Sequence, residues 1–267
     1  MNGVRIMTFC SLSFFFLLLL SGMLDGAIGT VIYYLALPLV AAVALYLLRD
    51  KLCKSRMLYI KREELFSSLV YIFPGIACVM AVSYVTSLVL SLFGVSTDTS
   101  INETLPLAIL IYAVYPAIFE ELLFRYIPLR LSEKMPHGML VISSSVLFAL
   151  VHADLASIPY ALVAGAIFML IDLKYRSVLP SLIMHFVNNL LSVLFTLYSS
   201  LAIFSAVYFA LIILAALISL WVIVRKEKML ITPTVSELLR TAGSLECYKD
   251  ILMLLIPTIL VALMKLL

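Results

Sequence analysis

Long apolar runs alternate with short polar segments along the whole chain. A helix needs about 20 mainly apolar residues to cross the hydrocarbon core of a bilayer, because it rises 1.5 Å per residue. Runs of about this length occupy 6–24, 27–48, 66–94, 105–124, 138–153, 157–173, 177–198, 201–224 and 251–267. The last run is short and contains Lys265. The pattern therefore predicts an all-α bundle with eight or nine transmembrane spans.

The composition supports this prediction. Of the 267 residues, 64% are hydrophobic and only 12% are charged, whereas soluble domains carry about 25% charged residues. A soluble fold of this size has too little interior to bury so much apolar surface. We interpret 6–24 as a retained span rather than a cleaved signal peptide, since no A-x-A-like site follows it. The whole chain, 1–267, is expected to form a single integral membrane domain.

The positive charges indicate how the chain lies in the membrane. Of the 18 Lys and Arg residues, all except Lys265 fall in segments that the predicted spans place on one side. By the positive-inside rule this side is the cytoplasm, so the loops 49–65, 125–137 and 225–250 are expected there. The four cysteines show no CxxC pair, which gives no support for a zinc ribbon or a disulfide framework.

Three predicted spans contain polar groups that are costly inside a membrane. These groups are Glu120, Glu121 and Arg125 in the fourth span, His152 (four residues after Phe148) in the fifth, and His185 and Asn189 in the seventh. A single polar residue of this kind more often joins helices by a hydrogen bond than performs chemistry. Three clusters with two histidines and a carboxylate pair favour a functional site.

Helix geometry assigns different roles to the two adjacent glutamates. Glu121 lies four residues before Arg125, the favoured spacing for an ion pair within one helix. Glu120 and His152 are equally distant from Pro136 in the turn between two antiparallel spans, so they are expected at equal depth. Glu120 is therefore the carboxylate that is free to face a cavity.

Other polar residues have simpler interpretations. A second acidic pair, Glu63–Glu64, lies at a basic boundary and is expected at a solvated helix start. His137, beside Pro136, is expected in a solvated turn. The three serines 143–145 are expected to pack helices together.

The ordered motifs EExxxR (Glu120, Glu121, Arg125), FxxxH (Phe148, His152) and HxxxN (His185, Asn189) resemble the CPBP family of intramembrane endopeptidases. That family includes type II CAAX prenyl endopeptidases and bacteriocin-processing or self-immunity proteins. The resemblance covers about 105–195, which is the expected catalytic core. It implies a helical bundle with a cavity open toward the cytoplasm, and a glutamate-dependent hydrolysis that needs no metal ion and no cofactor.

The chemistry of the residues agrees with this resemblance. Glu120 and His152 can orient and deprotonate a water molecule, while His185 and the Asn189 amide can donate to the oxyanion of a tetrahedral intermediate. Glu121, Arg125 and Phe148 are expected to support the site structurally. The expected location is the cell membrane, with a peptide or lipidated protein, such as a prenylated CAAX tail, as substrate and no nucleic acid as partner.

Three alternatives remain at this stage. A zinc protease would use Glu and two His as ligands, but HExxH is absent. A proton-coupled transporter would also place Glu and His inside the membrane, although no repeated halves with broken helices are evident. A catalytically silent immunity or scaffold protein of the same fold is the third.

Overall fold

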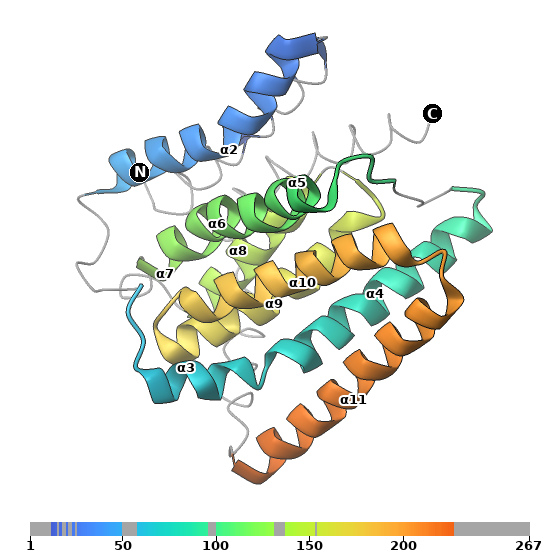
Figure 1. Cartoon of the computed structure of the whole chain (residues 1–267). Helices are drawn as coiled ribbons and strands as arrows, with labels where there is room; N and C mark the ends of the chain where they lie inside the picture. The colour runs from blue at the N-terminus through green and yellow to red at the C-terminus, as the bar shows by residue number, and fades with distance from the viewer. Residues whose placement is uncertain are drawn as a thin grey trace.

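The computed structural model is a bundle of helices, with no β-strand among the residues that it describes (Figure 1). Those residues are 12–14, 16–17, 20, 23–24, 26–49, 58–95, 100–130, 137–152 and 154–226. In chain order the helices are α2 (Gly26–Leu48), α3 (Arg62–Leu69), α4 (Ile72–Leu92), α5 (Leu105–Ile109), η1 (Leu110–Val114), α6 (Tyr115–Glu121), η2 (Leu122–Tyr126), α7 (Ile127–Arg130), α8 (His137–Leu150), α9 (Ser157–Tyr175), α10 (Leu179–Tyr198) and α11 (Ala202–Lys226).

Six helical segments are long and apolar enough to cross a membrane within the described part of the chain. A seventh helix, α8, is apolar but has only 14 residues. Seven of the nine predicted spans thus correspond to helices, with ends that differ by a few residues. The predicted span 251–267, most of 6–24 and the loop 227–250 lie outside the described residues, so the count of eight or nine spans stays a prediction.

The segment Leu105–Arg130 is one continuous helix interrupted by two π turns. The turn η1 ends two residues before Pro116, and η2 ends two residues before Pro128. Proline has no N–H to donate and its ring clashes with the carbonyl four residues earlier, so the helix widens there. The carbonyl four residues before Pro128, that of Phe124, instead accepts a hydrogen bond from the Ser144 hydroxyl of α8. The two π turns frame α6, which carries both glutamates.

Helices α8 and α9 pack closely because a glycine lies at their crossing. A Cβ on Gly165 of α9 would come within 2.9 Å of Ser145 Cα in α8. Ser143, Ser144 and Ser145 are buried and each hydroxyl donates to a backbone carbonyl. Ser144 bonds the neighbouring long helix and Ser145 lies against Gly165 of α9, which agrees with the predicted packing role of these two, whereas the Ser143 hydroxyl bonds within α8.

The two ends of the bundle differ in charge. The α9–α10 turn, the start of α3 and the end of α7 lie at one end, the left end in Figure 1, and carry Lys61, Arg62, Arg130, Lys174 and Arg176. The α4–α5 connection and the α10–α11 turn lie at the other end. The described residues of 93–104, 151–157 and 199–201 include no Lys or Arg. We call these the cation-rich end and the cation-poor end.

Candidate active site

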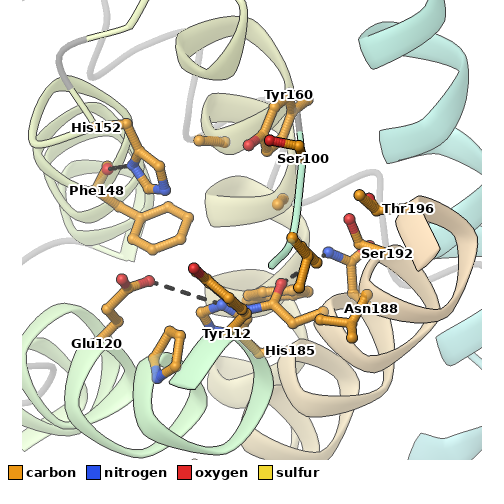
Figure 2. Close-up of a pocket in the computed structure, with 17 residues that line it drawn as sticks. Ser100, Tyr112, Glu120, Phe148, His152, Tyr160, His185, Asn188, Ser192 and Thr196 are labelled. Atoms are coloured by element: carbon orange, nitrogen blue, oxygen red, sulfur yellow. Dashed lines mark hydrogen bonds and ion pairs between the residues drawn. The ribbon is translucent and has the colours of Figure 1, made fainter. Parts of the chain in front are cut away.

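A cavity of about 440 Å³ brings the predicted residues together (Figure 2). Its lining residues come from η1, α6, α8, α9 and α10, from the turn after α8 and from the connection before α5. They include Ser100, Tyr112, Glu120, Phe148, His152, Tyr160, Phe168, His185, Asn188, Asn189, Ser192 and Thr196. All four residues expected to be catalytic from the sequence therefore lie on one cavity.

His185 lies between the two glutamates. Its Nδ1 is 2.8 Å from Glu121 Oε1, a hydrogen bond between buried side chains. Its Nε2 is 3.7 Å from Glu120 Oε2, on the cavity side. Because a carboxylate accepts the bond at Nδ1, this nitrogen carries the proton in the neutral ring. Glu121 thus fixes the orientation of His185, a contact that the sequence did not predict.

The predicted pair of Glu121 and Arg125 is present behind the cavity lining. Both side chains are fully buried, and Arg125 Nε is 3.6 Å from Glu121 Oε2. This distance is short enough for an ion pair but too long for a good hydrogen bond. The Arg125 guanidinium also lies 4.4 Å from the centre of the Phe148 ring, a cation–π contact. Phe148 therefore contacts Arg125 on one side and lines the cavity on the other.

His152 follows the last turn of α8, and its ring faces the cavity above Phe148 (Figure 2). Its Nδ1 lies 2.8 Å from the Phe148 carbonyl oxygen. A carbonyl only accepts, so Nδ1 carries the proton and Nε2 presents a lone pair in the neutral ring. Glu120 lies on the same side of the cavity, with its side chain 19% exposed. Glu120 and His152, both described residues, form no direct hydrogen bond or ion pair with one another, and both line the cavity.

Several polar residues of the cavity were not singled out from the sequence. Asn188 donates from its amide to Asn189 Oδ1 at 3.2 Å. Ser192 lies seven residues after His185, so the helical repeat places it on the same face of α10. This spacing is the sequence signal that could have identified Ser192. Nothing in the sequence pointed to Tyr112 and Tyr160, which reach the cavity from other helices.

A second buried carboxylate supports the start of α10. Asp172, at the end of α9, is fully buried. It accepts hydrogen bonds from the Ser181 backbone N–H at 3.2 Å and from the Ser181 hydroxyl at 2.6 Å. An acceptor at this position satisfies an N–H group in the first turn that has no partner within the helix. Asp172 therefore holds the part of α10 that carries His185.

The other minor expectations have simple outcomes. Glu63 and Glu64 are exposed in the first turn of α3, and His137 is exposed at the start of α8, as predicted. Cys78 is a free cysteine, and the other three lie outside the described residues. No group of three or more His, Cys, Asp or Glu that could hold a metal ion occurs among the residues that the structure places.

The cavity lining reaches the cation-poor end of the bundle. Ser100 and Ile101 belong to the α4–α5 connection, while Tyr160 and Thr196 lie near the ends of α9 and α10 on that side. The predicted opening toward the cytoplasm stays a prediction.

Comparison with known proteins identifies one family. Residues 102–191 match the family described as "Type II CAAX prenyl endopeptidase Rce1-like". Among curated proteins and solved structures, none matches the chain. The matched residues include Glu120, Glu121, Arg125, His152, His185 and Asn189.

Proposed function

The match of residues 102–191 supports membership of the CPBP family, and on this premise we propose that the chain is a glutamate-dependent intramembrane endopeptidase. One observation carries the proposal. Glu120, His152, His185 and Asn189 come from three separate segments and line one cavity. The set contains a base, a second acceptor and two hydrogen-bond donors, which are the groups that hydrolysis of an amide by water requires.

In the proposed reaction, Glu120 is the general base. Its carboxylate takes a proton from water, and the resulting hydroxide attacks the carbonyl carbon of the scissile peptide bond. The lone pair on His152 Nε2 accepts the other hydrogen of this water and orients it. The proton held by Glu120 then passes to the departing amine, so acid and base roles fall to one carboxyl group.

His185 and Asn189 are the proposed donors to the oxyanion. The Asn189 side chain offers an amide N–H. His185 donates from Nε2, which requires a proton on each ring nitrogen. Glu121 accepts from Nδ1 and Glu120 lies near Nε2, so each N–H has a carboxylate beside it in the resting site.

The setting of the proposed reaction is an integral, multi-pass membrane protein, as the six apolar helices indicate. We place the catalytic core at about 105–195 within one membrane domain. The proposed substrate is a membrane-proximal peptide, of which a prenylated CAAX tail is one example. The proposed location is the cell membrane.

A cleavage assay with the purified protein separates this proposal from its alternatives. We expect cleavage of a membrane-derived peptide mixture that persists in excess chelator, because the proposed mechanism needs no metal ion. Loss of cleavage on chelation with recovery on adding zinc would favour a zinc protease. Proton-coupled solute flux in vesicles without any cleavage would favour a transporter. The absence of both cleavage and flux would favour a silent scaffold.

The natural substrate can be sought by comparing the proteomes of membranes that contain the wild-type protein or the Glu120→Gln variant. Peptide ends that appear only with the wild type identify cleaved bonds. Identical sets of peptide ends in the two membranes would contradict the proposed activity in those cells.

A further inference from the structure

Tyr160, on α9, lines the candidate active site but has no part in the proposed reaction. It borders the cavity that holds Glu120 (Figure 2) and also a second cavity of about 1150 Å³, whose walls are mainly apolar side chains of α4 and α11. Asn188, Asn189 and Ser192 of α10 are shared by the two cavities in the same way. A group at this junction can contact a substrate at a distance from the reacting bond.

The turn before α9 holds the Tyr160 hydroxyl through two neighbouring side chains. The Asp154 carboxylate accepts from the Ser157 backbone N–H at 3.0 Å, as an acidic residue does before the first turn of a helix. The same oxygen accepts from the Ser157 hydroxyl at 2.6 Å. The Tyr160 hydroxyl lies 3.2 Å from Ser157 Oγ. The three side chains therefore form one continuous series of hydrogen bonds.

The direction of each hydrogen bond in this series is determined by its acidic end. A carboxylate only accepts, so the single hydroxyl hydrogen of Ser157 is directed to Asp154. Ser157 has no hydrogen left for Tyr160, and the bond between the two hydroxyl groups is therefore donated by Tyr160. The phenol hydrogen is thus used within α9. Only lone pairs on the Tyr160 oxygen remain for a ligand, so Tyr160 is an acceptor toward the cavity.

Tyr160 lies well away from the reacting groups along α9. Phe168 marks their level, because its ring centre is 5.5 Å from that of His185. Phe168 and Tyr160 are separated by eight positions of one helix, or about 12 Å by helical rise. A peptide in an extended conformation covers this distance with about three or four residues.

A peptide bound in the cavity carries backbone N–H groups, and an N–H that is buried without an acceptor costs free energy. Asn188 and Ser192 can each donate or accept, so they suit either an N–H or a carbonyl group. Tyr160 suits only a donor, since its own hydrogen is already used. Among these three residues of the junction, Tyr160 is therefore the one that selects a donor.

We propose that Tyr160 is a substrate-binding residue that accepts a hydrogen bond from a backbone N–H about three or four residues from the scissile bond. This inference rests on the proposed hydrolytic function for the identity of the ligand. It implies a preference for peptides that extend this far on one side of the cleaved bond and have a free N–H there. A prenylated CAAX tail and other membrane-proximal peptides can both meet this requirement.

The test compares N-methylated peptides in the wild type, in Tyr160→Phe and in Tyr198→Phe. The probe is a synthetic prenylated peptide with a CAAX end, together with copies that are N-methylated at one backbone nitrogen each. Tyr198, a described residue at the end of α10, lines neither of the two cavities and gives the matched control. Binding is measured with Glu120→Gln added to each protein, and cleavage without it. Unfolding temperatures show that all variants are folded, and mass spectrometry of the products locates the cleaved bond.

We expect one N-methylation, at the predicted distance from the cleaved bond, to weaken binding about 3- to 10-fold more in the wild type and in Tyr198→Phe than in Tyr160→Phe. This factor is the usual contribution of one hydrogen bond. For the unmodified peptide, Tyr160→Phe should raise KM with kcat nearly unchanged, because the contact is the same in the bound substrate and in the transition state. Equal losses in the three proteins at every position would overturn the inference, as would a difference confined to the nitrogen of the cleaved bond or a wild type that does not bind the peptide.

Ser157→Ala tests the direction of the hydrogen bonds. The variant leaves the Tyr160 hydroxyl without its acceptor, so the phenol hydrogen can turn toward the cavity. A peptide with an ester in place of the amide at the selected position presents an oxygen instead of an N–H. The loss of binding caused by this ester should be smaller in Ser157→Ala than in the wild type. Equal losses would overturn the assignment of Tyr160 as an acceptor.

The binding and cleavage measurements separate this inference from the proposed function. A position-specific difference in binding, without cleavage of the peptide by the wild type, would contradict the proposed hydrolysis and support the role of Tyr160. Cleavage by the wild type, without a position-specific difference between the proteins, would refute the role of Tyr160 alone.

Discussion

The two adjacent glutamates have different surroundings, although they are identical in chemistry. Glu121 is fully buried and faces both Arg125 and His185. Glu120 is partly exposed to the cavity, and its carboxylate lies near the outer nitrogen of His185. A carboxylate held by two partners positions other groups, whereas one that contacts the cavity can reach a water molecule. This difference is the reason why we propose Glu120, and not Glu121, as the general base.

At the same scale, we predict that Arg125→Ala destabilises the protein strongly. The variant leaves the Glu121 carboxylate buried without its cation, and breaking a buried pair in this way costs about 3–5 kcal/mol. The double variant Glu121→Gln/Arg125→Gln should recover part of this loss, because it removes both charges and the new amide oxygen at position 121 can still accept from His185. Thermal unfolding in detergent measures both. Equal stability of the single and double variants would show that the two residues are not coupled.

Asn189 provides a test of the oxyanion role. Asn189→Ala should lower kcat by about 100- to 1,000-fold, the usual cost of one oxyanion donor, with little change in stability. Asn189→Asp keeps the size of the side chain but replaces the amide donor with an acceptor, so its loss should be at least as large. Steady-state cleavage rates check both variants. A kcat within about threefold of the wild type in Asn189→Asp would exclude the role.

Sequence spacing predicts contacts within one helix better than contacts between helices. The Glu121–Arg125 pair follows from an interval of four residues and is present. The bond from His185 to Glu121 joins residues 64 positions apart, and its geometry depends on how α10 packs against α6. The sequence pattern placed His185 and Asn189 on one face but could not indicate which glutamate His185 meets.

At the scale of the elements, the length of each apolar run predicts where a helix lies, while individual residues change where the helix ends and how regular its turns are. The run at 66–94 lies in α3 and α4, which are joined by a turn at Val70 and Tyr71 whose backbone angles stay in the right-handed helical region. The helix predicted at 105–124 continues to Arg130. The π turns before Pro116 and Pro128 were not expected, because the regular 3.6-residue repeat carries no signal for a widened turn.

A prediction at the scale of the elements concerns the crossing of α8 and α9. Gly165→Ala should lower the free energy of unfolding by about 1–3 kcal/mol, because the new Cβ would lie 2.9 Å from a backbone atom, Ser145 Cα. Gly75→Ala is the matched control. Its Cβ would meet the terminal methyl of Met184, which is the end of a flexible side chain and can move. Similar unfolding temperatures for the two variants would show that α8 and α9 can move apart at this crossing without loss of stability.

For the whole molecule, the sequence indicates the membrane setting and which side each loop takes. The described cations at the helix ends lie at one end of the bundle, as the sequence predicts. The resemblance predicts a cavity that opens toward the cytoplasm, and this direction stays a prediction, because it depends on how side chains from separate helices pack. The buried residues Asp172 and Ser181 belong to none of the three motifs, and their bond forms only when α9 and α10 pack.

The most direct test of the central claim is the turnover of Glu120→Gln. The substitution keeps the size of the side chain but removes its ability to take a proton from water. Glu63→Gln, at the exposed start of α3, is the matched control. Peptide cleavage is followed with equal amounts of purified, folded protein. The account predicts loss of cleavage in Glu120→Gln with unfolding temperature and substrate binding retained, and unchanged turnover in Glu63→Gln. Near-normal turnover in Glu120→Gln would contradict it.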